Sequence, residues 1–172
     1  MNPRATEAQI KAATVDDLPA IRDLATVIWR AYYPAVVSRE QIEYMLGRMY
    51  DLNTLRDEVQ TQSTRFDRML LADALVGFAA YGPLTEPGTW KLHKLYLLPE
   101  HHGCGLGSQL LRHCEAQSRA LGAQRMLLNV NKRNARALAA YQRNGWVVAD
   151  SVCVDIGNGF VMDDFIMSKE LA

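Results

Sequence analysis

The sequence predicts an α+β, mixed α/β fold in which a single, mostly antiparallel sheet is flanked by helices. This fold class follows from a change of period along the chain. Up to residue 61, apolar side chains recur every three to four positions, as in amphipathic helices; from residue 69, short apolar runs between turn residues are typical of strands. The resulting order, β-α-α-α-β-β-β-α-β-α-β-β, places helices against one sheet.

Composition points to one globular domain over residues 1–172. Apolar residues make up 49% of the chain, enough for a core without metal or disulfides. Nineteen basic and nineteen acidic residues cancel, which argues against a nucleic-acid or membrane-surface binder. No apolar run approaches the ~20 residues of a membrane span, and the N-terminal segment MNPRATEAQIKAA lacks the apolar centre of a signal peptide. Three cysteines at unrelated spacings indicate a reducing compartment, so we expect a cytoplasmic protein.

The N-terminal third of the chain carries the helical pattern. Its predicted elements are a strand at Ile10–Ala13, a helix opened by Thr14 and closed by Pro34, a helix capped by Ser38, and a helix at Leu55–Thr61 capped by Asn53. Ser, Thr and Asn are preferred N-caps because their side chains accept hydrogen bonds from the first free N–H groups.

The rest of the chain mixes strands and helices. The predicted strands are Met69–Ala72, Leu75–Tyr81, Lys91–Leu98, Met126–Val130, Trp146–Ala149, Val152–Ile156 and Phe160–Met167, the last two joined by a turn at Gly157–Gly159. The predicted helices begin at Leu106 and Asn134 and end at Gly122 and Gly145, because glycine is the usual residue after a helix.

The chain is organised around residues 91–108, KLHKLYLLPEHHGCGLGS, where a strand, a glycine-rich loop and a helix start follow one another. Gly103, Gly105 and Gly107 leave main-chain N–H groups unshielded by side chains. The first N–H groups of a helix lack intrahelical partners and lie at the positive end of its dipole, so this arrangement suits a phosphate group. It is neither a Walker nor a Rossmann loop, because no Gly-Lys-Ser/Thr ends it and its spacing is G-x-G-x-G. A turn without a ligand is the alternative.

The loop resembles the acetyl-CoA loop of the GNAT superfamily of N-acetyltransferases, Arg/Gln-x-x-Gly-x-Gly/Ala, which here is residues 102–107, HGCGLG. His102 departs from the usual first residue. A second match is similar to the superfamily run L-x-V-x3-N-x2-A-x3-Y-x3-G-F/W and consists of Leu128, Val130, Asn134, Ala137, Tyr141, Gly145 and Trp146. The flanks QIEYMLGRMYDLNTL and DIGNGFVMDDFIMSKEL look like the bacterial branch that contains polyamine N-acetyltransferases.

This resemblance implies an enzyme that transfers acetyl from acetyl-CoA to a primary amine by direct attack in a ternary complex, with a small amine or polyamine favoured. Acetylation of a protein or peptide, or CoA binding without catalysis, are the alternatives. The residues that the resemblance assigns to acetyl-CoA lie on the strand, the loop and a helix N-cap: Leu95, Tyr96, Leu97, His102, Gly103, Cys104, Gly105, Leu106, Gly107, Ser108 and Asn134.

Acetyl transfer to an amine needs a base for the amine and an acid for the thiolate. The resemblance gives the acid role to Tyr141. Many relatives carry, at the position of Lys91, a glutamate that acts as the base. His93 shares a strand face with Lys91, and an ordinary pKa of ~6.5 suits it to take the proton, directly or through water. A water chain to a distant carboxylate is the alternative.

Other features leave their roles open. The aromatic side chains of residues 29, 32 and 33 (Trp29, Tyr32 and Tyr33) have two possible roles. They line the acceptor pocket, where their rings would bind a cation, or they pack in the core. Asp163 and Asp164 point to opposite strand faces, so one is available for the second charge of a polyamine. No metal is expected, because paired ligand spacings are missing among His101, His102, Cys104, His113 and Cys114. A C-terminal strand hairpin is compatible with a homodimer.

Overall fold

The computed structural model describes residues 7–171. Residues 1–6 and residue 172 lie outside the described residues, and so does part of the N-terminal segment in which no signal peptide was expected. The strands are β1 (Gln9–Ala12), β2 (Arg65–Leu71), β3 (Ala74–Pro83), β4 (Thr89–Leu97), β5 (Arg125–Asn131), β6 (Val147–Gly157) and β7 (Phe160–Glu170). The helices are α1 (Leu18–Tyr32), α2 (Arg39–Met49), α3 (Leu52–Gln60), α4 (Leu106–Ala120) and α5 (Ala135–Arg143).

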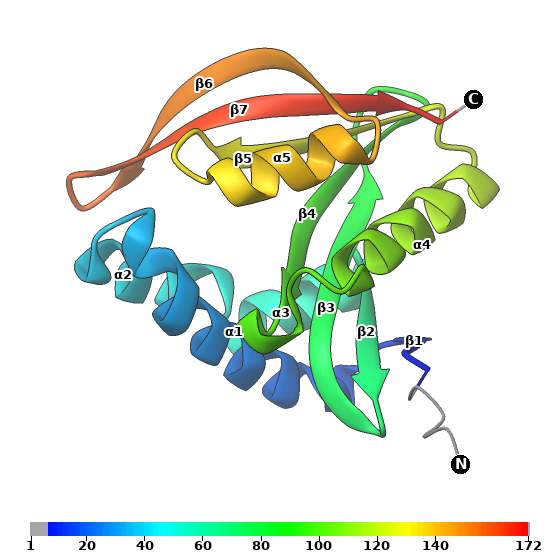
Figure 1. The fold of residues 1–172 in the computed structure, drawn as a ribbon, viewed down its shortest axis with the longest axis horizontal. Coiled ribbons are helices and arrows are strands. Elements are labelled where there is room, and N and C mark those ends of the chain that lie inside the picture. The colour runs from blue at the N-terminus through cyan, green and yellow to red at the C-terminus, as the bar shows by residue number, and fades with distance from the viewer. Residues whose placement is uncertain (1–6, 172) are drawn as a thin grey trace.

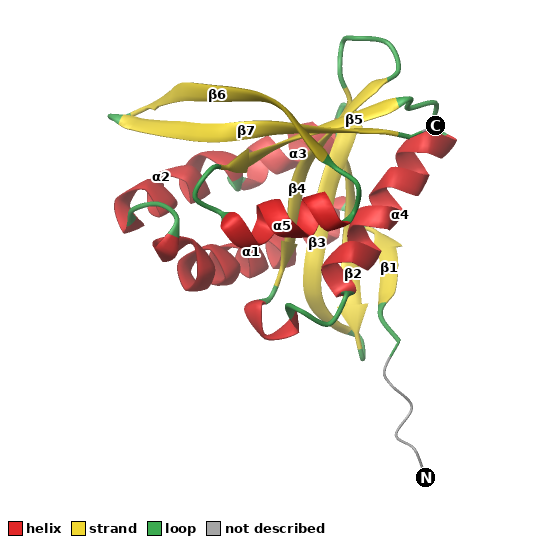
Figure 2. Ribbon diagram, turned by 45° about the horizontal axis from the view of Figure 1, so that its top comes forward, coloured by secondary structure: helices red, strands yellow, loops and turns green. Residues whose placement is uncertain are grey.

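The strands form one sheet in the order β1-β2-β3-β4-β5-β7-β6. Neighbouring strands are antiparallel except β4 and β5, which are parallel. Helices α1, α2 and α3 cover one face of the sheet, and α4 and α5 lie on the other (Figure 1, Figure 2). The predicted α+β fold is therefore confirmed. Within residues 7–171, no helix is long and apolar enough to span a membrane.

Each face of the sheet has its own cluster of buried side chains. The first joins α1, α2 and α3 to Phe66 and Phe78. The second joins α4 to Met126, Leu128 and Trp146. Full burial of one such side chain stabilises the fold by about 1.5–3 kcal/mol, so both helical layers are held mainly by apolar contact.

The helix caps agree with the sequence in part. Ser38 Oγ accepts a hydrogen bond from Gln41 N at 3.1 Å, as predicted for an N-cap. The cap of α3 is Asp51 rather than Asn53, because Asp51 Oδ2 accepts from the N–H groups of Asn53 and Thr54, both at 3.1 Å. The prediction of Asn53 was wrong because the helix begins before its first buried apolar residue, Leu55.

The C-terminal hairpin is longer than predicted. Residues 146–149 and 152–156 were expected to form two strands, but β6 is continuous. Its ladder with β7 pairs Val148 with Met167 and Asp150 with Ile166, which leaves Ala149 as an extra residue. A bulge of this kind bends the strand and increases its local twist instead of ending it. The hairpin turn, predicted at residues 157–159, is confirmed.

Candidate active site

The site begins where β4 and β5 separate. Their parallel pairing joins residues 89–92 to residues 125–128 and then stops. Beyond that point β4 continues to Leu97 and β5 to Asn131, so the facing edges of both strands are unpaired there. Main-chain groups that are not used in the ladder are available to a ligand between the strands.

A bulge lies at this separation. The ladder between β4 and β3 pairs Leu92 and Lys94 with consecutive residues of β3, so His93 has no opposite residue. A bulge reverses the side-chain alternation beyond it. Leu92 accordingly packs in the cluster under α4, whereas Lys94 lies over the rings of Tyr50 and Phe66 on the other face.

A groove of about 360 Å³, here called the loop groove, runs between the glycine loop, the start of α4 and the side of α5. Gly103 and Gly105 have φ values of +81° and +87°, a conformation that disfavours other residues. A Cβ atom at either glycine would meet nothing within 4 Å, so the space above the loop is open. Within residues 7–171, the main-chain N–H groups of residues 103–108 donate no hydrogen bond. The loop therefore presents free donors toward open space.

Most residues assigned to the cofactor lie around this groove. Those that line it are Leu95, Tyr96, Leu97, His102, Gly103, Gly105, Gly107, Ser108 and Asn134. Cys104 and Leu106 do not line it. Cys104 is exposed and its thiol donates to His101 O at 2.8 Å, while Leu106 packs against the cluster under α4. The side chains of these two residues therefore do not contribute to the walls of the groove.

His102 braces the loop against β4. Its Nε2 lies 2.8 Å from Leu97 O, and because a carbonyl only accepts, we assign the ring proton to Nε2. Nδ1 is buried and has no hydrogen-bond partner among the described residues. Burial lowers the pKa of His102, so the ring is neutral at pH 7. The residue that departs from the family pattern thus has a structural contact of its own.

Two asparagines fix the walls of the loop groove. Asn144 Nδ2 donates to Ser108 Oγ at 2.9 Å, which ties the end of α5 to the start of α4. Asn134 Oδ1 accepts from Ala137 N at 3.2 Å as the cap of α5, and from the Tyr32 hydroxyl at 2.9 Å. Asn134 is therefore both the predicted cap and a link to α1.

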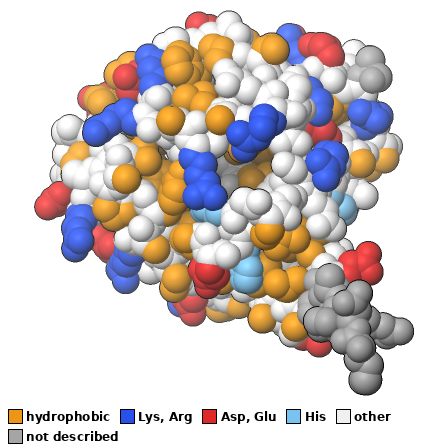
Figure 3. All heavy atoms as spheres, in the orientation of Figure 1, with side chains coloured by type: hydrophobic (Ala, Val, Ile, Leu, Met, Phe, Trp, Pro, Cys, Tyr) orange, Lys and Arg blue, Asp and Glu red, His pale blue; other side chains and the backbone are white. Residues whose placement is uncertain are grey.

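Positive charge surrounds the loop groove. Arg136 and Arg143, both exposed on α5, line it. On the face that carries α4 and α5, Lys and Arg side chains gather around a hollow (Figure 3). Together with the free N–H groups of the loop, this charge suits a polyphosphate.

A second cavity of about 850 Å³, here called the large cavity, opens on the side of α1, α2, α3 and the hairpin. Trp29 and Tyr33 line it and stack with ring centroids 4.4 Å apart, whereas Tyr32 lines the loop groove. The residues shared by both spaces are Tyr33, Leu95, Tyr96, Asn134, Ala137 and Tyr141. The two spaces therefore meet at the separation of β4 and β5.

Tyr141 stands at this meeting point. Burial raises the pKa of the Tyr141 phenol well above its ordinary value, so the hydroxyl keeps its proton at neutral pH. Burial likewise raises the pKa of Tyr33 and of Tyr96. All three hydroxyls are thus potential proton donors rather than bases.

His93, the expected base, does not have the ordinary histidine pKa that the sequence analysis assumed for it. His93 lines the large cavity and its side chain is exposed, although the surrounding protein partly desolvates the ring. Desolvation first, and then the positive charges of Lys91 and Lys94, lower the pKa of His93 to about 4. Burial also lowers the pKa of Lys91, while Asp164 opposes that shift. Near pH 7 His93 is neutral but only weakly basic.

The two adjacent acids of β7 do point to opposite sides. Asp163 is exposed and its carboxylate lies 2.6 Å from Lys132 Nζ. Asp164 is buried and lines the large cavity. Burial raises the pKa of Asp164, and Asn129, Lys91 and Lys132 act against that shift. The sequence left open which acid faces inward, because alternation alone does not say where the cavity lies.

The hairpin closes one end of the large cavity onto α2. Tyr44 Oη donates to Ile156 O at 2.7 Å, and Gln41 Nε2 donates to Val161 O at 2.9 Å. Gly157 is needed at this contact, because a Cβ atom there would lie 2.6 Å from Tyr44 Oη. Figure 1 shows the hairpin turn reaching the end of the molecule where α2 lies.

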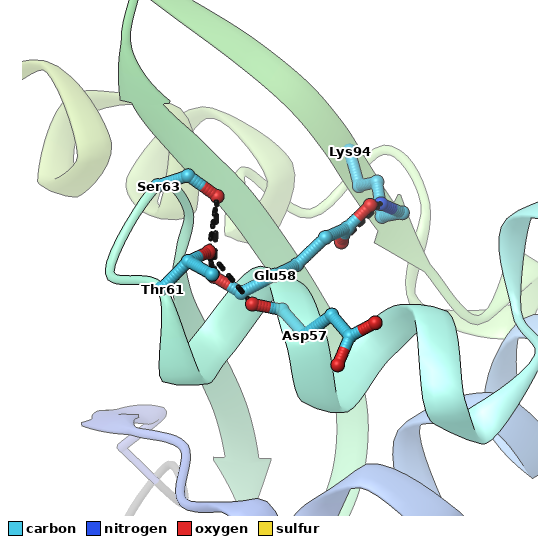
Figure 4. Close-up of polar contacts among 5 residues, drawn as sticks. All are labelled: Asp57, Glu58, Thr61, Ser63 and Lys94. Carbon is cyan, nitrogen blue, oxygen red and sulfur yellow. Dashed lines mark hydrogen bonds and ion pairs between the residues drawn. The ribbon is translucent and has the colours of Figure 1, made fainter.

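A carboxylate from α3 also reaches the large cavity. Glu58 Oε2 lies 3.1 Å from Lys94 Nζ, and the Lys94 side chain is only 6% exposed (Figure 4). Both residues line the cavity. Their distance of 36 positions along the chain gave the sequence no signal for this pair. In residues 7–171, no group of three or more His, Cys, Asp or Glu is placed to hold a metal ion.

Comparison with known proteins agrees with this geometry. The model of the acetyltransferase (GNAT) family matches residues 18–146. The spermidine N(1)-acetyltransferase of Thermoplasma acidophilum is 26% identical over 159 residues, which cover 90% of this chain and 95% of that protein. The IAA acetyltransferase of Azospirillum brasilense is 30% identical over 112 residues, 62% of this chain and 72% of that protein.

A solved structure leads to the same family. The crystal structure of PaiA N-acetyltransferase from Thermoplasma acidophilum in complex with coenzyme A has a TM-score of 0.82 to this chain at 26% identity. The match covers 95% of this chain and 99% of that one. The loop groove, the separated strands and Tyr141 thus belong to a chain that is a member of the acetyltransferase (GNAT) family.

Proposed function

We propose that this protein transfers the acetyl group of acetyl-CoA to a primary amine of a small cationic acceptor, such as a polyamine, by direct attack in a ternary complex. The observation that carries the proposal is the meeting of the loop groove and the large cavity at Tyr141. Two reactants that enter from these two spaces come together at the separation of β4 and β5. Holding both in place makes the reaction effectively unimolecular.

The residues of the loop groove fit acetyl-CoA. The free N–H groups of residues 103–108, at the positive end of the α4 dipole, would hold the pyrophosphate. Arg136 and Arg143 add positive charge beside it. The unpaired edge of β4, at residues 95–97, supplies main-chain groups for the amides of the pantetheine arm. The bound donor supplies the acetyl thioester.

The reaction requires two protons to leave the amine. An acceptor ammonium loses one proton before its nitrogen attacks the carbonyl carbon, and a C–N bond forms. The C–S bond breaks, the thiolate takes a proton from Tyr141, and the second nitrogen proton restores the phenol directly or through water. The raised pKa of Tyr141 keeps the phenol protonated until the thiolate forms. The products are an amide, a free thiol and one proton released to solvent.

The walls of the large cavity favour a small cation as acceptor. The rings of Trp29, Tyr33 and Tyr96 line it, and aromatic rings attract an ammonium group. Carboxylates from three elements line the same space: Glu58, Asp155 and Asp164. The contacts between α2 and the hairpin close one end of it, which favours a small molecule over a protein chain. The similarity to a spermidine N(1)-acetyltransferase supports the same class of acceptor.

His93 lies at the bulge and is neutral near pH 7. We propose that it passes the first amine proton onward, directly or through water, rather than retaining it. A group with a pKa of about 4 is too weak a base to hold a proton taken from an alkylammonium. The proton therefore needs a further acceptor.

The proposal is tested with a panel of amines and acetyl-CoA, scored by release of free thiol. We expect short polyamines and primary alkylamines to be acetylated with a kcat/KM at least tenfold above that for a lysine-containing peptide of equal charge. A higher kcat/KM for the peptide would change the acceptor class. Binding of CoA without thiol release from any amine would favour a CoA-binding module instead.

A further inference from the structure

One carboxyl group of the large cavity has no role in the mechanism above. Asp164 is 4% exposed, and its Oδ1 is buried without a hydrogen-bond partner among the described residues. A buried carboxylate oxygen that lacks a partner destabilises the fold, because it loses hydration without replacing it. Its neighbour Asp163 avoids this by pairing with Lys132 at the surface. An orphaned carboxylate oxygen that lines a cavity suits a cationic ligand.

Lys91 does not neutralise Asp164 by direct contact. Both side chains line the large cavity, and within residues 7–171 no ion pair joins them. Among the described residues, the Asp164 carboxylate therefore has no ion-pair partner. Among the other charged side chains of the large cavity, Lys94 pairs with Glu58, Arg48 donates to Ile156 O, and Asp155 Oδ1 accepts from Gly157 N.

We propose that Asp164 binds the attacking ammonium group of the acceptor and takes its first proton, directly or through His93 and water. This inference rests on the proposed function and deepens it. The N–H bond of the ammonium breaks, its electron pair stays on nitrogen for attack, and the proton moves to the Asp164 carboxylate. After the product leaves, that proton passes to solvent.

The charges around Asp164 set the pH at which it works. The groups that act on Asp164 are Lys91 on β4, Asn129 on β5, Lys132 after β5 and, from the outer side of its own strand, Asp163. His93 on β4 and Asp155 on β6 line the same cavity. Burial raises the pKa of Asp164, which brings the carboxylate closer in basicity to the amine than an exposed aspartate is. Lys91 acts against that shift, so removing its charge raises the pKa further.

The test compares two acceptors of similar size in the full-length protein. One is an alkyldiamine, cationic at pH 7; the other is an alkoxyamine, already neutral at pH 7. For Asp164→Asn we expect kcat/KM for the diamine to fall by about 10²-fold or more, and kcat/KM for the alkoxyamine to change by less than about threefold. The matched control is Asp163→Asn, which removes the adjacent, outward-facing carboxylate and keeps kcat/KM within about twofold.

The pH profile separates proton transfer from mere binding. The wild-type kcat/KM for the diamine rises with pH as Asp164 loses its proton, and Asp164→Asn lacks this rise. Lys91→Met moves the rise to higher pH, because the carboxylate loses a stabilising cation. Unchanged affinity of Asp164→Asn for CoA shows that the variant is folded.

Two results would overturn the assignment of Asp164 and leave the acetyltransferase proposal intact. The first is an equal loss of kcat/KM for both acceptors in Asp164→Asn. The second is a pH profile of Asp164→Asn in which kcat/KM for the diamine still rises as in the wild type. If the wild-type protein releases thiol with neither acceptor, the proposed function fails and the assignment fails with it. The two failures are therefore distinguishable in one experiment.

Discussion

The loop groove and the large cavity meet at Tyr141, yet they are built in different ways. The loop groove depends on main-chain groups of one continuous segment, residues 95–108, and on α5. The large cavity depends on side chains from α1, α2, α3 and four strands. The proposed donor site thus uses main-chain groups, which every residue carries, while the proposed acceptor site depends on the identities of side chains from several elements. This difference explains why the sequence indicated the donor more firmly than the acceptor.

The largest effect is expected where the two spaces join. Tyr141→Phe removes the phenolic proton and keeps the ring, so kcat falls by about 10²-fold or more while the affinity for acetyl-CoA is retained. Steady-state kinetics with calorimetric titration of CoA measures both quantities. Tyr81→Phe is the control, because the Tyr81 hydroxyl bonds Asp67 away from both spaces. An unchanged kcat in Tyr141→Phe across pH would assign the acid role elsewhere.

The loop groove is tested by one glycine substitution at each end of α4. Gly105 and Gly122 have φ values of +87° and +95°, and a Cβ at either meets nothing within 4 Å. Alanine at each position strains the backbone by about 1–2 kcal/mol. Only Gly105→Ala is expected to weaken CoA binding, by about tenfold, because its Cβ enters the space above the loop. Calorimetric titration measures this; equal affinities of both variants would argue against the loop as the phosphate site.

The large cavity is tested through its buried ion pair. Glu58→Gln leaves the ammonium of Lys94 buried without a countercharge and should lower the free energy of unfolding by about 1–3 kcal/mol, since Glu58 is partly exposed. Lys94→Met removes the buried charge instead and should be much milder. Urea unfolding of both variants measures the asymmetry. Equal losses would show that the pair acts through packing.

The smallest effect concerns His93. The pKa of His93 is about 4 in the folded protein and ordinary, 6.5, in the unfolded chain. Between pH 4 and pH 6.5 the unfolded state therefore binds more protons at His93 than the folded state does. Stability is therefore unaffected by His93 above about pH 6.5 and is lost as the pH falls toward about 4. His93→Gln should lose less stability on acidification, as measured by thermal unfolding from pH 7 to pH 4. It should also keep the rise of kcat/KM with pH; loss of that rise would make His93 the final base.

The sequence by itself determined the parts that depend on local spacing. The order of helices and strands, the glycine loop before α4 and the residues of α5 follow from periodicity, caps and motif offsets. Each of these is governed by residues within one or two turns of each other, so a linear pattern contains the needed information. The errors were local as well, such as Asp51 in place of Asn53 as the cap of α3.

Tertiary structure alone decided which side chains surround the acceptor. The pair of Glu58 and Lys94, the inward orientation of Asp164 and the closure of the hairpin on Gln41 join segments 36 to 120 positions apart. The lowered pKa of His93 likewise depends on burial and on neighbouring charges, neither of which appears in the residue's own identity. Spacing fixes what lies along one segment, whereas burial and charge are set by segments that meet only in the folded chain.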